Sequence, residues 1–258
     1  MQTHNQTDYK IEARNISKFF HVQNDVIHSL NDVSLGVKTN EFLVILGPGQ
    51  CGKSTLISCM SGILQPDYGD ILLNGQKVTE PGPSRGVVFQ QYALFPWKTV
   101  MDNVAFGLRT RGVSAAECRS VAQKYIDLVG LQGFEKHFPH QLSGGMRQRV
   151  CIARAYAGDP EVLFMDEPFS ALDAQTRYAM EGEILKIAEK EKKTVIFITN
   201  NVEEAIYLGD RIILMSSLPG TIKTEFVVDI PKPRNYTDPM FLEMRLAISE
   251  QMELVLDG

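Results

Sequence analysis

The sequence predicts an α/β fold built around a parallel sheet. Apolar strand-like segments alternate with segments of helical periodicity at residues 41–64, and the alternation returns after residue 161. This pattern is typical of parallel strands joined by helices. A strand-rich segment comes before it, and a helix-rich insert interrupts it after Gln91. With 258 residues, the chain is long enough for one well-buried core with a subdomain.

The N-terminal third is expected to supply most of the strands. Residues 11–20 and 28–37 alternate apolar and polar side chains, which predicts strands with one buried face. Residues 41–47, "EFLVILG", form a continuous apolar run that ends in glycine, which indicates a fully buried strand. Residues 54–64 then show helical spacing. The apolar positions of this helix are Leu56, Ile57, Met60, Ile63 and Leu64.

The insert between Gln91 and about Pro160 is expected to be helical. Before it, turn residues at 66–67 and 74–75 enclose one more short strand. Ser114 is a good N-cap for one of the helices, and Glu117 completes a capping box. The expected helices cover residues 99–112, 114–131 and 144–159.

Strand character returns in the C-terminal third, which ends in a helix at residues 238–256. Helix-like segments join the first strands, as in a parallel sheet, and a strand-rich stretch and a proline-rich turn precede the final helix. The expected strands cover residues 161–168, 192–199, 210–217 and 220–230.

Composition excludes several classes of protein. A net charge of -5 argues against a nucleic-acid binder, which usually has a basic face. The four cysteines form no CxxC pair, so free thiols in a cytosolic chain are the simplest interpretation. The polar N-terminus predicts no secretory signal, and no apolar run approaches the ~20 residues of a membrane helix. Any work at a membrane is therefore expected to go through a partner.

The loop after the strand at residues 41–47 has the pattern of a phosphate-binding loop. It fits G-x-x-x-x-G-K-[ST] with Gly47, Gly52, Lys53 and Ser54. Backbone N–H groups and the start of the following helix bind phosphate oxygens in such a loop, Lys53 adds charge, and the Ser54 hydroxyl can ligate Mg²⁺. The predicted nucleotide-binding residues here are Gly47, Pro48, Gly49, Gln50, Cys51, Gly52, Lys53, Ser54 and Thr55.

Gln50 stands where such loops often carry glycine, and its side chain restricts φ. Because the chemistry of the loop is mostly that of its backbone, we expect phosphate binding to survive, with Gly49 absorbing part of the strain.

An acidic pair follows the strand within residues 161–168. Asp166 is expected to hold the magnesium, and Glu167 to polarise a water for attack on the γ-phosphate. Taken alone, the pair could be ordinary chemistry at a strand end; the loop upstream favours the catalytic interpretation.

The segment "QLSGGMRQRVCIARA", residues 141–155, resembles the signature of ATP-binding cassette (ABC) ATPases, which are P-loop NTPases. The resemblance implies a nucleotide-binding core of residues 1–90 and 160–258 with a parallel sheet and an antiparallel β subdomain, and a helical subdomain of residues 91–159. It also implies a second subunit whose nucleotide is contacted by this signature. The residues implied are Gln141, Ser143, Gly144 and Gly145. A plain helix N-cap is the alternative for "LSGG".

Other segments extend this resemblance over nearly the whole chain. Gln90 of "GVVFQQYALFPW" matches the residue that faces magnesium and water, and the aromatic residues after it are core or subunit contacts. Asp173 of "SALD" is placed at the dimer seam, and Phe20 of "SKFF" under the adenine, with core packing as its alternative. Asn200 stands where the family usually has a histidine that bonds the γ-phosphate. An amide donates one hydrogen bond but carries no charge, so binding should survive while the rate is in doubt.

Residues 90–117 and 226–252 are most similar to the ATPase subunits of nitrate, sulfonate, taurine and bicarbonate importers. The implied protein hydrolyses ATP with Mg²⁺, pairs with a second ATPase subunit, and energises two membrane permease subunits and a solute-binding protein from the cytoplasmic face of the membrane. One alternative is a soluble ABC ATPase acting on nucleic acid or ribosomes; the single cassette and short insert oppose it. The other is a slowly hydrolysing regulator, which Asn200 favours and Glu167 opposes.

Overall fold

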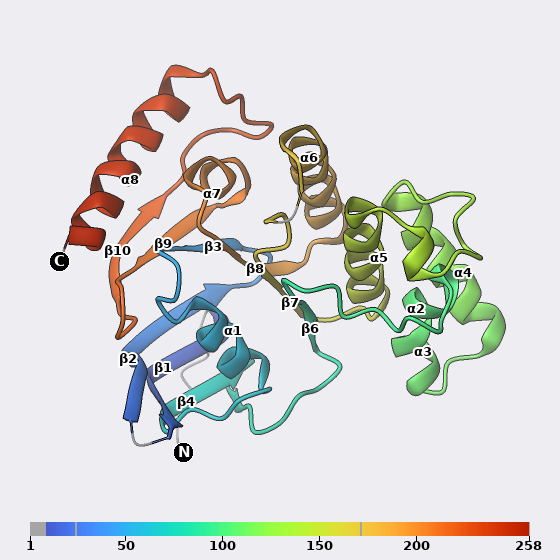
Figure 1. The fold of residues 1–258 in the computed structure, drawn as a ribbon, viewed down its shortest axis with the longest axis horizontal. Coiled ribbons are helices and arrows are strands. Elements are labelled where there is room, and N and C mark those ends of the chain that lie inside the picture. The colour runs from blue at the N-terminus through green and yellow to red at the C-terminus, as the bar shows by residue number, and fades with distance from the viewer. Residues whose placement is uncertain (1–8, 24, 171, 258) are drawn as a thin grey trace, which may run out of the picture. The chain divides into compact units, whose positions relative to one another are not determined.

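The structure is a computed structural model that describes residues 9–23, 25–170 and 172–257. The polar N-terminus, residues 1–8, therefore lies outside the described part. The chain divides into two compact units (Figure 1). The first runs up to Gly82 and resumes at Lys192, and the second is Pro83–Glu191.

The first unit contains an antiparallel sheet in the order β2-β1-β4-β5. Ala13 of β1 is paired with Leu35 of β2 on one side and with Ile71 of β4 on the other. The left-handed residues Asn74 and Gly75 turn the chain from β4 into β5. The bounds are β1 Tyr9–Val22, β2 Asp25–Lys38, β4 Tyr68–Leu73 and β5 Gln76–Lys77. This sheet is the antiparallel β subdomain that the sequence predicts.

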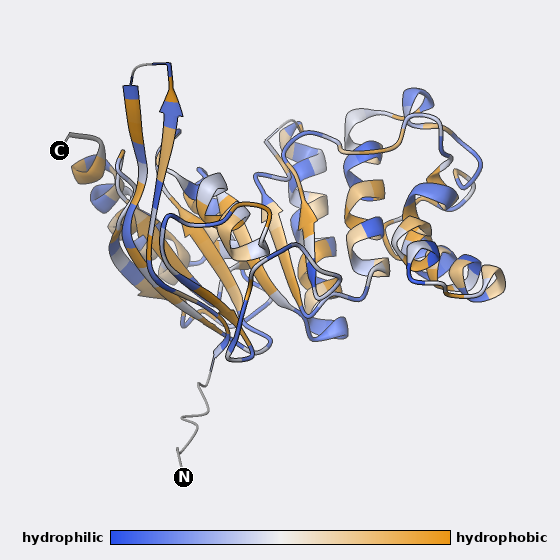
Figure 2. Ribbon diagram, turned by 90° about the horizontal axis from the view of Figure 1, so that it is seen from below, coloured by the Kyte–Doolittle hydropathy of each residue, from blue (hydrophilic) through white to orange (hydrophobic). Residues whose placement is uncertain are grey.

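Beyond the end of β4, strands β1 and β2 continue as a two-stranded ribbon (Figure 2). Pairing of β1 with β4 ends at Ser17 and Tyr68, whereas pairing of β1 with β2 continues to Val22 and Asp25. Phe20 lies in this ribbon, paired with Ile27.

The first unit also contains a parallel sheet, in which β3 lies between β8 and β9, and β10 adds an antiparallel edge. All residues of β3 and β8 are buried, which explains the apolar sequence of β3 and the apolar run between Thr194 and Thr199 of β8, and Figure 2 shows the central strands as hydrophobic. The bounds are β3 Phe42–Leu46, α1 Lys53–Ser61, β8 Thr194–Thr199, α7 Val202–Leu208, β9 Arg211–Met215, β10 Ile222–Val227 and α8 Pro239–Asp257. The predicted helix at residues 54–64 thus ends earlier, with Ile63 and Leu64 past its end.

The second unit combines a pair of parallel strands with helices. Arg85–Val88 of β6 pairs in parallel with Val162–Met165 of β7. Gly86 is required there, because a Cβ on it would lie 2.9 Å from the Pro160 ring. The bounds are β6 Arg85–Val88, α2 Val100–Val104, α3 Phe106–Thr110, α4 Ala115–Leu128, the 3₁₀ turn η1 Pro139–Gln141, α5 Gly144–Ala157, β7 Val162–Asp166 and α6 Ala174–Glu191.

The α/β class with its antiparallel sheet and helical region is confirmed. Ser114 caps α4 by accepting a bond from the Glu117 amide, as predicted. The single helix expected at residues 99–112 is instead two helices that meet at Ala105. The interruption is local to Ala105, because its amide still bonds the Met101 carbonyl at 2.9 Å and its carbonyl accepts from the Arg109 amide at 3.1 Å. Residues 91–159 lie within a unit that also holds β6, β7 and α6.

Candidate nucleotide-binding and hydrolysis site

The loop between β3 and α1 has the geometry of a phosphate-binding loop. Gly52 caps α1 with φ 93°, and a Cβ on it would lie 2.7 Å from the Ser29 carbonyl oxygen, so only glycine fits. Lys53 is 4% exposed, and its Nζ donates to the carbonyl oxygens of Gly47 (2.8 Å) and Pro48 (2.6 Å). The loop therefore wraps around the lysine ammonium, at the start of a helix that favours anions.

Neighbouring contacts fix the loop on the antiparallel sheet. The Ser29 hydroxyl of β2 donates to the Thr55 hydroxyl at 3.0 Å. The Cys51 thiol is buried, and burial raises its pKa although Lys53 acts in the opposite direction. Cys51 is therefore a neutral packing residue at neutral pH.

The strain of the loop lies at Gln50. Its φ is 62°, in the left-handed region that disfavours residues with a Cβ. Gly49 is not among the glycines of positive φ. The expectation that Gly49 absorbs part of the strain is therefore wrong. The side chain of Gln50 is exposed, so the cost arises from its Cβ against its own backbone and not from packing against other residues.

Asn200 follows the strand next to the phosphate-binding loop. Leu46 of β3 and Thr199 of β8 are paired in the parallel register, so Gly47 and Asn200 both leave the carboxyl edge of the same sheet. Ligands of open α/β sheets bind at this edge. Asn200 is exposed. Its position beside the loop is the one expected of a residue that contacts a phosphate.

The acidic pair and Gln90 meet at the end of β7. Asp166 is the last residue of β7, and Glu167 follows it with φ 42°. The Nε2 of Gln90 donates to Oε2 of Glu167 at 3.2 Å. The registry of β6 with β7, with Val88 opposite Met165, brings Gln90 and Glu167 to this edge. The amide thereby orients the carboxylate that the sequence assigns to water activation.

The signature forms the start of helix α5. Ser143 caps the helix by accepting from the Met146 amide at 3.3 Å. A Cβ on Gly144 would lie 3.1 Å from the Tyr92 hydroxyl, and one on Gly145 would lie 3.1 Å from Cγ2 of Thr176. Side chains from two other segments thus contact the first turn of α5, and both glycines are tightly packed.

The residues around this turn are ordered by their own hydrogen bonds. Gln141 accepts a bond from the Phe138 amide at 2.8 Å. Asp173 accepts from the amide (3.0 Å) and the hydroxyl (2.7 Å) of Thr176. These bonds lower the pKa of Asp173, the hydroxyl bond most of all, so it is a carboxylate at neutral pH. Ala171 lies outside the described residues, between Ser170 and Asp173 of the "SALD" segment.

Phe20 lies in the ribbon of β1 and β2 with its side chain half-buried. The Nζ of Lys18, on the same face, lies 5.7 Å from the centroid of its ring. The neighbouring Phe19 is on the other face, where it stacks on His28 at 4.2 Å. Part of the Phe20 ring is thus accessible to a flat ligand.

The segment after Gln90 is ordered by residues that belong to none of the sequence motifs. Asn103 is fully buried, and its amide bonds the backbone of Phe95 and Lys98. The Nη1 of Arg154 donates to the Ala93 carbonyl at 2.6 Å. The signal for Asn103 was a polar residue between the apolar positions of a helical pattern. Trp97, at the end of the segment, is 71% exposed.

The described residues contain neither a cluster of metal-binding side chains nor a helix that could span a membrane. Within residues 9–23, 25–170 and 172–257, no group of three or more His, Cys, Asp or Glu side chains is arranged to hold a metal ion. In the same residues, none of the helices combines the length and the apolar composition that crossing a bilayer requires.

The sequence of this chain is similar to those of known proteins. The family described as ABC transporter matches residues 30–170. An uncharacterized ABC transporter ATP-binding protein of Methanocaldococcus jannaschii is 49% identical, over 93% of this chain and 90% of the relative. A taurine import ATP-binding protein of Roseobacter denitrificans is 45% identical over 84% of this chain and 81% of its own length. An aliphatic sulfonates import ATP-binding protein of Bacillus anthracis is 38% identical over 94% of this chain and 96% of its own.

A solved structure supports the same conclusion about the fold. It is the dimer of an ATP-binding cassette in a post-hydrolysis state, bound to ADP and phosphate. It superposes with a TM-score of 0.77 at 30% identity, and the match covers 86% of this chain and all of that one.

Proposed function

Because the chain belongs to the ABC transporter family of ATPases, we propose that it is the ATP-hydrolysing subunit of an importer for a small anion. The named relatives include import ATP-binding proteins for taurine and for aliphatic sulfonates, and both substrates carry a sulfonate group. A sulfonate is therefore the leading substrate class, with nitrate and bicarbonate as alternatives. The reaction is the hydrolysis of ATP to ADP and phosphate.

The loop of residues 47–55 binds the phosphates of ATP in this proposal. The buried ammonium of Lys53 and the N-terminus of α1 supply positive charge on the same side of the loop. Phe20 stacks on the adenine with the accessible part of its ring.

The donor set proposed for magnesium suits that ion. The Ser54 hydroxyl, the Asp166 carboxylate and the Gln90 amide oxygen are all oxygen ligands, which Mg²⁺ prefers. Because Nε2 of Gln90 donates to Glu167, its Oε1 is the atom available as a ligand. When bound, the ion would neutralise charge on the β- and γ-phosphates.

The contact between Gln90 and Glu167 is the observation that carries the proposal of hydrolysis. A protein that only binds nucleotide has no need of a carboxylate oriented by an amide at the end of β7. Glu167 accepts the proton of the attacking water, and Gln90 keeps the carboxylate in place.

A slowly hydrolysing regulator is the second candidate, and Asn200 favours it. The asparagine donates one neutral hydrogen bond to the γ-phosphate, whereas a histidine would donate a charged one. This difference lowers the rate without removing the site.

A second subunit is proposed to complete each site. The N-terminus of α5, at Ser143, Gly144 and Gly145, favours the binding of an anion. Because the phosphate loop already binds the chain's own nucleotide, the anion at α5 would be the γ-phosphate of the nucleotide bound to the second subunit. Asp173 lies at the seam of this dimer. The dimeric cassette bound to ADP and phosphate supports the arrangement.

Membrane permease subunits are the proposed partners of residues 91–97. Trp97 is exposed, and its ring centroid lies 5.8 Å from that of Phe95, so two aromatic rings share one surface segment. The segment directly follows Gln90, so a movement of Gln90 on binding of the γ-phosphate would also move the segment. The chain would thus act at the cytoplasmic face of the membrane, peripheral to it, with a solute-binding protein delivering the anion.

Equilibrium titration and turnover of two variants test the proposal. Lys53→Ala should abolish nucleotide binding, whereas Glu167→Gln should bind ATP normally and hydrolyse none. Lys77→Ala, at an exposed lysine of β5, is the control for loss of a positive charge. Normal ATP affinity of Lys53→Ala, or normal turnover of Glu167→Gln, would contradict the site. Co-purification then identifies the permease and solute-binding partners.

A further inference from the structure

Helix α7 begins immediately after the turn that holds Asn200, and it is short. It has seven residues, Val202–Leu208. A helix of this length is not stable alone in water. The position of α7 therefore depends on the contacts that neighbouring residues make with its two ends and with the side chains between them.

The turn at the start of α7 is rigidly joined to the helix. Oδ1 of Asn201 accepts from the amides of Glu203 (2.8 Å) and Glu204 (3.2 Å). The Thr199 hydroxyl donates to the buried Glu204 carboxylate at 2.6 Å and accepts from the Asn201 amide at 3.0 Å. Because these bonds join the residues on both sides of Asn200 to α7, the backbone of Asn200 moves with the helix and sets where its side chain starts.

The other end of α7 is held by Arg234, from the segment after β10. This guanidinium is 6% exposed, and its Nη1 donates to the carbonyl oxygens of Ile206 (2.5 Å) and Gly209 (2.6 Å). Its Nε donates to the Ile230 carbonyl at 2.9 Å. A cation at a helix C-terminus is favourable, and here it satisfies carbonyl groups that the helix leaves without partners.

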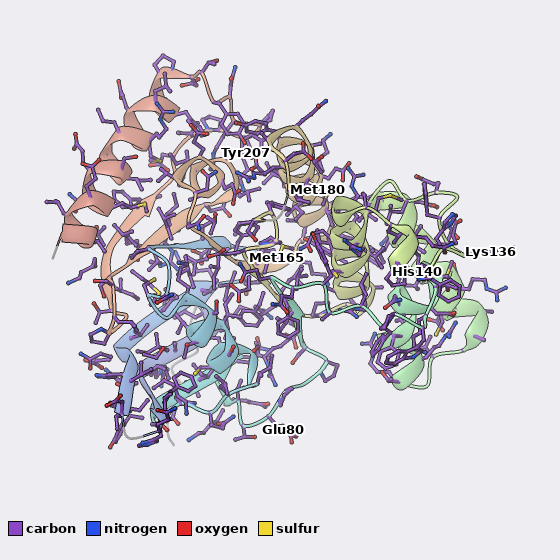
Figure 3. The ribbon with its side chains drawn as sticks, in the orientation of Figure 1. Glu80, Lys136, His140, Met165, Met180 and Tyr207 are labelled. Atoms are coloured by element: carbon purple, nitrogen blue, oxygen red, sulfur yellow. The ribbon has the colours of Figure 1, made fainter. Side chains whose placement is uncertain are left out.

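The side of α7 is held by two more residues of the C-terminal segment. Tyr236 stacks on Tyr207 with ring centroids 4.9 Å apart and planes inclined by 2°. Tyr207 is labelled on α7 in Figure 3. The Nη1 of Arg245, on α8, lies 2.8 Å from Oε1 of Glu203. Residues from after β10 and from α8 thus contact α7 at both ends and between them.

We propose that Arg234, Tyr236 and Arg245, here called the C-terminal clamp, position Asn200 for hydrolysis of ATP. The proposal rests on the proposed function, because Asn200 acts on a γ-phosphate only in an ATPase. Clamp residues are positioning residues that act through α7. The phosphate loop is held by different contacts, those of Lys53 and of Ser29 with Thr55. Loss of the clamp should therefore lower turnover and leave ATP binding intact.

Two clamp variants test this with a matched control. Tyr236→Leu and Arg245→Ala are used because the removal of Arg234 would leave buried carbonyl groups unpaired and threaten folding. Each should lower kcat by about threefold to tenfold and change Kd and KM for ATP by less than about twofold. The control is Arg109→Ala. Its ion pair with Asp102, at 2.7 Å with exposures of 49% and 37%, closely matches that of Arg245 with Glu203, at 2.8 Å with 47% and 34%.

A double-mutant cycle separates positioning from a general structural effect. In an Asn200→Ala background, Tyr236→Leu and Arg245→Ala should lower kcat no further, because the side chain that they position is gone. Amide hydrogen exchange supplies a readout independent of activity. The amides of residues 201–204 should exchange about tenfold faster in the clamp variants, with those of α5 unchanged.

The possible results are distinct. An unchanged kcat in both folded clamp variants would overturn the proposal, and so would an equal loss of kcat in the Asn200→Ala background. If the wild-type protein binds and hydrolyses ATP, the proposed function stands, whatever the clamp variants show. A wild-type protein without turnover would remove both.

Discussion

Replacing Asn103 with alanine should destabilise the protein markedly, although this residue lies outside every nucleotide-binding motif. The side chain is fully buried. Oδ1 accepts from the Phe95 amide at 2.9 Å, and Nδ2 donates to the carbonyl oxygens of Lys98 (3.0 Å) and Phe95 (3.2 Å). Alanine removes all of these bonds and leaves the segment that ends at Trp97 without its internal anchor.

The size of the effect follows from which backbone groups lose their last partner. The Phe95 carbonyl keeps a bond from the Lys98 amide at 3.1 Å. The Phe95 N–H and the Lys98 carbonyl lose the bonds that Asn103 supplies. An unsatisfied buried group costs about 1–3 kcal/mol, and this segment is partly exposed, so we expect a total on the order of 3 kcal/mol.

Urea unfolding, followed by circular dichroism, measures this loss. The control is Gln132→Ala, since the Gln132 amide also donates to a backbone carbonyl, that of Asp127 at 3.0 Å, but on the exposed surface. It should change the free energy of unfolding by less than about 0.5 kcal/mol. If Asn103→Ala is as stable as that control, the buried amide does not order the segment. ATP binding should be unchanged in both variants.

Other predictions concern the chemistry and the partners. With Glu167→Gln to block turnover, ATP should trap a closed dimer in size-exclusion chromatography; a strictly monomeric protein, even with its membrane subunits, would count against the shared site. Replacing Phe95 and Trp97 with alanine should impair transport or assembly of the complex more than ATP binding, and unchanged transport by a stable complex would defeat that assignment. Asn200→His should raise turnover, because a charge-assisted bond to the γ-phosphate is worth on the order of 2 kcal/mol, or roughly thirtyfold. Brisk wild-type turnover with no gain from histidine would refute this explanation of Asn200. Chelation of divalent ions by EDTA should stop hydrolysis. If an active preparation keeps its turnover after EDTA is added, the magnesium site is contradicted.

Local sequence patterns predicted the helices and strands whose own residues carry the signal, either as a buried apolar run or as a capping residue. The apolar β3 and the mainly apolar β8 were found from their composition, and the N-cap of α4 from Ser114 ahead of the helical pattern. Strand β6, "RGVV", was missed because it is short and only its last residue is buried. It is a strand because it pairs with β7, a contact between segments far apart in the chain.

The site shows the same division. Short motifs led to the candidate phosphate loop, the candidate acidic pair and the start of α5, because such chemistry demands particular residues at fixed spacing. Arg234 could not be identified in that way, since its partners, the carbonyl groups of residues 206–230, carry no side-chain signal. The sequence also raised the question of strain at Gln50, but only backbone geometry could place the strain at that residue rather than at Gly49.

The two-stranded ribbon beyond the end of β4 bears on which nucleotides the protein accepts. Phe20 lies in a part of β1 that has β2 as its sheet neighbour but is no longer paired with β4. With Phe20 as the stacking residue, the ring contacts the flat face of the base, which every base presents. The edge that distinguishes adenine from guanine lies away from that contact. Selectivity between purines is then weak at this end of the site, and GTP is expected to support turnover nearly as well as ATP.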